Sequence, residues 1–221
     1  MLYLIVSLKK SAETNIYHWQ KKLRFIDQPI TVISGIAIEI TDGGTADGIT
    51  ISNIKMNDVQ TPLFLFLGNR GRKQPGDTSV VLVGTMKNIV LNNITATSHS
   101  KMTSSVSAFP GYYIENVILN NVHINGMGDG DSSDTKIILP EVPAAYPENR
   151  MYGDVYPASG LYIRYAKNII LNKIDFSFRN KDFRPAVIME DVIGGTINGL
   201  KSQQHDESPV VKQINCKEIV Q

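Results

Sequence analysis

The sequence predicts an all-β protein that folds as a parallel β-helix of about five or more coils. Three observations lead to this prediction. A short apolar pattern recurs along the chain, a second set of short segments alternates with a period of two, and asparagine recurs at one position of the repeat. Each repeat therefore supplies at least two short strands, without helical stretches between them.

The first repeated pattern is apolar, any residue, apolar, two small polar residues, apolar. Its copies are GITISNI (48–54), NIVLNNI (88–94), NVILNNV (116–122), NIILNKI (168–174) and GTINGL (195–200). Their anchors, spaced by 40, 28, 52 and 26 residues, are Ile51, Leu91, Leu119, Leu171 and Ile197. The short steps indicate a unit of about 26 to 28 residues, and the long steps contain insertions of about 12 and about 25. The five anchors are expected to form one internal column.

A second series consists of GIAIEIT (35–41), PLFLFLG (62–68), GLYIRYA (160–166) and PAVIMED (185–191). Its alternation places inward Ile36, Leu63 and Leu161, then Ile38, Leu65, Ile163 and Ile188. The outward positions are Glu39, Phe66, Arg164 and Met189, with Ala37, Phe64, Tyr162 and Val187 beside them. An acid, aromatic rings and an arginine on one face are typical of a sugar-binding surface, because rings stack on sugars and guanidinium groups bind carboxylates. The alternatives are that Phe64 and Phe66 pack under a loop and that Glu39 and Arg164 are ordinary surface charges.

Asn53, Asn93 and Asn121 occupy one repeat position, at which the chain must turn. Asparagine tolerates the left-handed backbone conformation and hydrogen-bonds locally, so stacked turns are expected to form an amide ladder. A leucine-rich repeat is the main alternative, but it needs a more regular leucine pattern and usually a helix in each unit. A β-sandwich fits less well, because its strands need not repeat in sequence.

Two domains are predicted, a divergent segment over residues 1–33 and a β-helix over residues 34–221. The opening MLYLIVSLKK lacks a basic region before its apolar run and a small-residue cleavage site after it, so we interpret it as a strand. A short helix is expected to begin near Ser11. The first segment would act as a cap, and loop insertions are expected near residues 73–85 and 127–159.

Composition narrows the classes of function. The 22 basic and 21 acidic residues balance, which argues against a nucleic-acid partner, and no apolar stretch is long enough to span a membrane. A single cysteine, Cys216, excludes an internal disulfide. No metal or other cofactor is expected, because the four histidines lack metal-ligand spacing and Asp129, Asp131 and Asp134 lack the bidentate glutamate of a calcium loop.

Two loops supply further candidate contacts. TPLFLFLGNRGR (61–72) ends an apolar strand in a glycine-hinged turn, which presents Asn69, Arg70 and Arg72. The 127–159 insertion is long and rich in proline and tyrosine, so it is expected to form one wall of a cleft. Its candidate contacts are Glu141, Tyr146, Glu148, Arg150 and Tyr152.

SGIAIEITDGG, TPLFLFLGNRGR, AYPENRMYG and SGLYIRYAKNI together resemble the C-terminal half of glycoside hydrolase family 28, the polygalacturonase-like family. The resemblance runs from about residue 34 to the C-terminus. It implies a right-handed parallel β-helix, hydrolysis of pectic polysaccharide with inversion, and a periplasmic or secreted location. No signal peptide is visible, so the location is left open. The partner would be a polysaccharide or oligosaccharide.

The sequence also departs from the family pattern. The family's Asp-Asp and Gly-His-Gly motifs are absent, and Phe64-Leu65-Phe66 stands where an Arg-x-Lys strand is expected. We therefore expect a truncated or divergent member of the family. The sequence-based candidates for catalysis are Glu39 with Asp42 or Glu148. The candidates for substrate binding are Phe66, Asn69, Arg70, Arg72, Tyr146, Arg150, Tyr162 and Arg164.

Three functions stay open from sequence alone: a pectin-degrading hydrolase, a non-catalytic carbohydrate-binding β-helix, and a structural remnant that dimerises through an exposed coil. Inverting hydrolysis requires two carboxyl groups. The alternation places only Glu39 clearly on the outward face, and a second carboxylate must come from the 127–159 insertion. We therefore expect the chain to bind pectic polymers without cleaving them efficiently.

Overall fold

The computed structural model describes residues 4–7, 34–73, 76, 78–203 and 209–221, and within them the regular elements are β-strands and two short 3₁₀ turns. The strands are β1 (Leu4–Ser7), β2 (Ser34–Ile40), β3 (Thr45–Val59), β4 (Thr61–Leu67), β5 (Thr85–Ser98), β6 (Ser104–Ser107), β7 (Ile114–Gly126), β8 (Leu161–Phe178), β9 (Val187–Ser202), β10 (Val211–Ile214) and β11 (Lys217–Val220). The turns are η1 (Asp134–Lys136) and η2 (Asn149–Tyr152).

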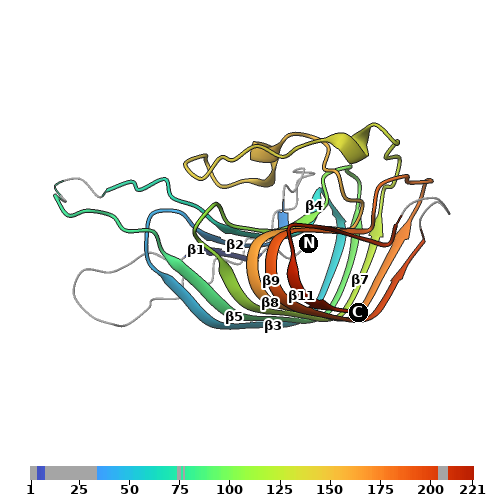
Figure 1. The fold of residues 1–221 in the computed structure, drawn as a ribbon, viewed down its shortest axis with the longest axis horizontal. Helices are drawn as coiled ribbons and strands as arrows, with labels where there is room; N and C mark the ends of the chain where they lie inside the picture. The colour runs from blue at the N-terminus through green and yellow to red at the C-terminus, as the bar shows by residue number, and fades with distance from the viewer. Residues whose placement is uncertain (1–3, 8–33, 74–75, 77, 204–208) are drawn as a thin grey trace.

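The strands all pair in parallel, in the order β1-β2-β4-β6-β8-β7-β5-β3. Strand β9 lies beside β8, and β10 and β11 both pair with β9. The start of β8 pairs with β6 and the rest of it with β7, so one long strand joins the two series of repeats. This all-β arrangement of parallel strands fits the predicted parallel β-helix (Figure 1).

The predicted internal column is confirmed. Ile51 pairs in register with Leu91, and the column continues through Leu119 and Leu171 to Ile197. All five side chains are buried in one core between the strand layers. The predicted strand in the opening segment is also confirmed, because β1 pairs in parallel with β2. The helix expected near Ser11 lies outside the described residues.

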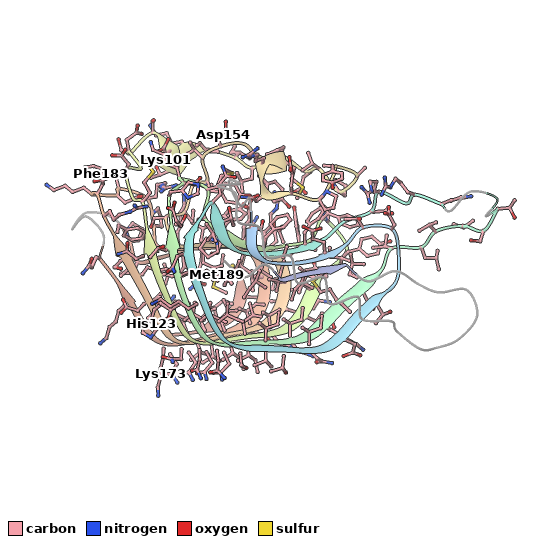
Figure 2. All side chains as sticks on the ribbon, turned by 180° about the vertical axis from the view of Figure 1, so that it is seen from behind. Lys101, His123, Asp154, Lys173, Phe183 and Met189 are labelled. Carbon is pink, nitrogen blue, oxygen red and sulfur yellow. The ribbon has the colours of Figure 1, made fainter. Side chains whose placement is uncertain are left out.

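The second series of segments needs two corrections. First, β9 is shifted by one residue from the predicted alignment: Tyr162 pairs with Ile188, and Ile163 pairs with Met189. Val187 and Met189 therefore lie in the inner core and Ile188 lies outside it, as Figure 2 shows for Met189. Second, β6 is a repeat that the pattern missed, because its sequence SSVS has a single apolar residue.

The predicted asparagine ladder is confirmed. Asn53, Asn93 and Asn121 all have a positive φ, between 53° and 60°. The Nδ2 of Asn93 donates to Oδ1 of Asn53 at 3.0 Å, and the Nδ2 of Asn121 donates to Oδ1 of Asn93 at 2.8 Å. Two further ladders run parallel to it, one through Asn88, Asn116 and Asn168 and one through Asn92, Asn120 and Asn172.

Asn93→Ala is expected to destabilise the fold by about 1–3 kcal/mol, because alanine strains a left-handed position and breaks two ladder hydrogen bonds. Asn93→Gly relieves the backbone strain but not the loss of the hydrogen bonds, so its cost should be smaller. Urea unfolding of the three proteins checks this order. Equal stability of the alanine variant and the wild type would contradict a structural role for the ladder.

The longest described segment between strands covers one side of the strand stack (Figure 1). Residues 127–159, which we call the 127–159 loop, contain both 3₁₀ turns and lie over the short strands (Figure 1). Lys101 and Asp154 are on this side of the molecule, whereas His123 and Lys173 are on the opposite side (Figure 2). In the described part of the chain, no helix is long and apolar enough to cross a membrane. The division into segments 1–33 and 34–221 stays a prediction.

Candidate active site

The outer face of the short strands carries the residues from which the sequence predicts a site. One column runs in register from Glu39 through Phe66, Ser107 and Arg164 to Glu190. The 127–159 loop covers the middle of this face and creates a second apolar cluster outside the main core. That cluster contains Ala37, Phe64, Phe66, Met102, Leu139, Tyr152, Tyr156, Ala158, Tyr162 and Ile188. The expectation of an open face is therefore wrong for its central part.

Arg164 is 2 % exposed and lies beneath the 127–159 loop. Its guanidinium donates to the carbonyl oxygens of Leu139 (3.1 Å) and Pro140 (2.7 Å), and it packs against the ring of Tyr152 at 4.9 Å. Glu141 contributes an ion pair at 3.4 Å. The predicted exposed position of Arg164 is corrected, because a planar guanidinium with several donors is well suited to anchoring a loop through its carbonyls.

Phe66 and Tyr162 are likewise buried beneath the loop rather than exposed as sugar platforms. The Phe66 ring packs edge-on against Tyr152, with their centroids 6.3 Å apart. Burial raises the pKa of Tyr162, and so does the hydrogen bond that its hydroxyl donates to Glu190. The small side chain of Ser107 on β6 makes room for the rings of the loop. Ser107 lies between Phe66 and Arg164 and hydrogen-bonds the Tyr152 hydroxyl at 2.7 Å.

Glu39 is half-buried at the β2 end of the outer column. Burial raises its pKa to about 7, because the carboxylate form loses hydration there. The positive charge of Arg70 lowers this pKa, whereas the negative charge of Glu148 from the 127–159 loop raises it. The charge of Glu148 is thus within electrostatic range of Glu39, whose proton titrates close to neutral pH.

Asp42 follows β2 and holds both arginines of the Gly68–Arg72 turn. Nε of Arg70 donates to Oδ1 of Asp42 at 3.1 Å, the backbone N–H of Arg72 donates to the same oxygen at 3.0 Å, and Nε of Arg72 lies 3.6 Å from Oδ2. Burial acts to raise the pKa of Asp42, but these hydrogen bonds and the two positive charges lower it below its usual value. Asp42 is thus an ionised anchor for the arginines.

Of the other predicted contacts, Tyr146 and Asn69 lie at the arginine turn, whereas Arg150 lies at the opposite end of β4. Tyr146 is 69 % exposed and its ring lies 5.7 Å from the guanidinium of Arg70. The side chain of Arg72 is 65 % exposed, so its guanidinium is accessible from solvent despite the neighbouring Asp42. Arg150 is exposed and donates to Oε1 of Gln60 at 3.1 and 3.2 Å. Asn69 is exposed, and its backbone N–H donates to the carbonyl of Pro143.

Gly68 permits the close contact between this turn and the 127–159 loop. A Cβ atom at Gly68 would lie 2.6 Å from the Phe66 ring and 2.7 Å from the Pro143 carbonyl oxygen. Any larger residue would therefore have to displace the loop or the ring. Glycine is required at this position because no space is left for a side chain between the turn and the 127–159 loop.

A buried ion pair, which was not predicted from the sequence, anchors the 127–159 loop near Gly130. Arg184 and Asp182 are 1 % and 0 % exposed, with two hydrogen bonds between their side chains at 2.6 and 3.0 Å. Arg184 also donates to the carbonyls of Lys101 and Tyr156, and Asp182 accepts from the N–H of Gly130. The opposite charges two residues apart in the segment RNKDFRP were the available signal for this ion pair.

Asn149 is a second anchor of the loop that was not predicted, and the local sequence gave no signal for it.

The site brings together a carboxyl group that titrates near neutral pH, a second carboxylate, an accessible guanidinium and an exposed ring. The groups belong to Glu39, Glu148, Arg72 and Tyr146. Among the residues that the structure describes, no group of three or more histidine, cysteine, aspartate or glutamate side chains is placed to hold a metal ion. The chemistry available from these side chains is proton transfer together with binding of an anionic ligand.

The fold and this site together define an all-β protein of parallel strand repeats with carboxyl groups and arginines on one face. The family described as Glycosyl hydrolases family 28 matches residues 34–144, which is half of the 221-residue chain. The chain belongs to this family. The match includes Glu39, Asp42 and the arginine turn, whereas Glu148 lies just beyond it. Comparisons with curated proteins and with solved structures found no match.

Proposed function

We propose that this protein hydrolyses a glycosidic bond of a uronic-acid-containing, pectic polysaccharide at the site formed by Glu39 and Glu148. The observation that carries the proposal is the half-buried position of Glu39 on the outer face, with a pKa raised to about 7 by burial and by the charge of Glu148. Membership of glycosyl hydrolase family 28 supports the reaction class. We also infer that the strand repeats wind in a right-handed coil, as parallel strand connections almost always do.

In the proposed reaction, Glu39 acts as the acid and Glu148 as the base. Glu39 donates its proton to the glycosidic oxygen as the bond to the anomeric carbon breaks. Glu148 accepts a proton from the water whose oxygen bonds to that carbon from the opposite face. Water is thereby divided between the two sugar products, and the stereochemistry at the anomeric carbon inverts. The negative charge of Glu148 also helps Glu39 to keep its proton.

The arginine turn supports a uronic-acid substrate. Asp42 fixes the backbone and the side chains of the turn, and the exposed guanidinium of Arg72 is suited to a sugar carboxylate. The exposed ring of Tyr146 is suited to stacking on the apolar face of a sugar ring. The central face beneath the loop is filled by side chains, so substrate would bind at the Glu39 end of the column.

Arg72→Ala is expected to weaken binding of oligogalacturonides by about tenfold or more, because a charge-assisted hydrogen bond is lost. Binding of neutral oligosaccharides of equal length should change little. Calorimetry with both ligand classes measures the difference, and Lys55→Ala, which removes an exposed lysine from β3, is the matched control. An equal loss for both ligand classes would contradict recognition of a uronic acid.

Binding without cleavage is the second candidate function. It is favoured by the absent family motifs and by Phe64 and Phe66, which occupy an expected Arg-x-Lys strand and are buried by the loop. Incubation of the purified protein with polygalacturonate and rhamnogalacturonan, with new reducing ends as the readout, separates the two functions. Turnover that Glu148→Gln abolishes supports hydrolysis. Binding with no new reducing ends supports the second candidate. Turnover that neither Glu39→Gln nor Glu148→Gln reduces would overturn the assignment of the site.

A further inference from the structure

Asn149 is a fully buried polar residue that connects the 127–159 loop to the strand stack. It is the first residue of η2 and comes directly after Glu148. Its Nδ2 donates to Oγ1 of Thr61, the first residue of β4, and lies 3.5 Å from the sulfur of Met102. Its carbonyl oxygen accepts from the hydroxyl of Tyr156 at 2.8 Å. Both its side chain and its backbone are therefore held from opposite sides.

The turn around Glu148 depends on this anchor. The η2 turn has four residues and no side-chain hydrogen bond at its N-terminal cap, and so short a turn is not stable alone. Glu148 itself bonds through its backbone, donating to the carbonyl of Tyr146 and accepting from the N–H of Met151. These contacts stay within the loop. Of the two neighbouring residues, Asn149 is the one whose side chain bonds to a strand.

The position of Asn149 also carries a cost. Its Oδ1 is buried with no hydrogen-bond partner among the described residues, and an unsatisfied buried acceptor destabilises a fold. An apolar residue would fill the space without that cost but would leave the Thr61 hydroxyl without this donor. The asparagine is therefore explained better by what its amide holds in place than by packing.

We propose that Asn149 is a positioning residue, which fixes the backbone that carries Glu148 and so keeps this carboxylate within electrostatic range of Glu39. The catalytic meaning of this placement rests on the proposed function, but the placement itself does not. The other charged group that acts directly on Glu39 is Arg70, which is in turn affected by Asp42 and Tyr146. Arg70 and Asp42 lie outside the 127–159 loop, and within that loop Glu148 is the residue whose charge acts directly on Glu39, so the influence of Asn149 on Glu39 should pass through Glu148.

The test measures how strongly Glu148 acts on Glu39 with and without the anchor. Glutamate carboxyl carbons are labelled, the Glu39 resonance is assigned by its loss in Glu39→Gln, and its pKa is obtained by NMR titration. The change in this pKa caused by Glu148→Gln is then compared in wild type, Thr61→Val and Thr61→Ser. Valine keeps the shape of Thr61 but removes the acceptor of the Asn149 amide, whereas serine retains it.

In wild type, Glu148→Gln should lower the pKa of Glu39, because a neighbouring negative charge is removed. In the Thr61→Val background, Glu148→Gln should lower the pKa of Glu39 by less than about half of the wild-type change. In the Thr61→Ser background, it should lower this pKa by the full wild-type amount. An equal effect in all three backgrounds, or none in wild type, would overturn the proposal. If Thr61→Val does not fold, Asn149→Ala takes its place in the same comparison. No substrate is used, so failed hydrolysis and failed positioning are distinguished.

Discussion

Glu39→Gln is expected to lower kcat/KM for a pectic polymer by about 10²–10⁴-fold, because the glutamine side chain has no acidic proton to donate to the leaving oxygen. Affinity for the polymer should stay within a few-fold of wild type, since glutamine has nearly the same shape. Glu115→Gln is the matched control, because Glu115 lies on β7 in a 3.7 Å ion pair with Lys167. Turnover that survives Glu39→Gln would remove Glu39 from the mechanism.

The same residue determines the expected pH dependence. Glu39 must be protonated to act as an acid, and its pKa is about 7. Activity should therefore fall as the pH rises through about 7. Arg70→Met should move this fall to higher pH, because the positive charge that lowers the pKa of Glu39 is removed. A fall that stays in place in the Arg70 variant would show that another group is being titrated.

Asp182→Ala is expected to destabilise the protein by about 3–5 kcal/mol, because it leaves the buried guanidinium of Arg184 without its counter-charge. Removing Asp182 also takes away the acceptor for the N–H of Gly130, where the 127–159 loop begins. Urea unfolding measures the change in the free energy of unfolding. The midpoint should shift to lower urea while the slope stays the same.

An exposed ion pair provides the control for this loss. Asp47 and Lys87 lie 3.5 Å apart, and both side chains are 43 % exposed. Asp47→Ala also removes the acceptor for the side chain of Asn88, so a cost of about 1 kcal/mol is expected. If Asp182→Ala costs no more than Asp47→Ala, the ion pair of Asp182 and Arg184 contributes little to anchoring the loop.

The strand repeats were predictable because the local sequence of each repeat indicates where its strands and its corners lie. The anchors from Ile51 to Ile197 share a local pattern, and asparagine marks the corners where φ is positive. The pattern fails where composition hides the alternation. The residues around Ile188 are all apolar, so a shift by one residue leaves no trace in the sequence. Strand β6 has the opposite problem, because its serines resemble a loop.

Half of the candidate site was predictable for the same reason. Alternation identifies the side of a strand on which Glu39 lies, and the glycine-hinged turn identifies Arg70 and Arg72. Alternation does not reveal what covers that side. Arg164 and Phe66 belong to the outer face, yet a segment without periodicity packs over them. The path of that segment is set by pairings between distant residues, such as Asn149 with Thr61, which no local pattern encodes.

The asparagine ladders have a consequence for how such a protein can change. Ladder partners are separated by 28, 40 or 52 residues, and yet the hydrogen bonds between them have nearly the same length. The number of residues between two corners is thus independent of the geometry at the corners, and lengthening a flexible connection costs little. Insertions can accumulate in the connections while the stacked frame stays constant. The loops that cover the outer face can therefore change in length and sequence without altering the strand that carries Glu39.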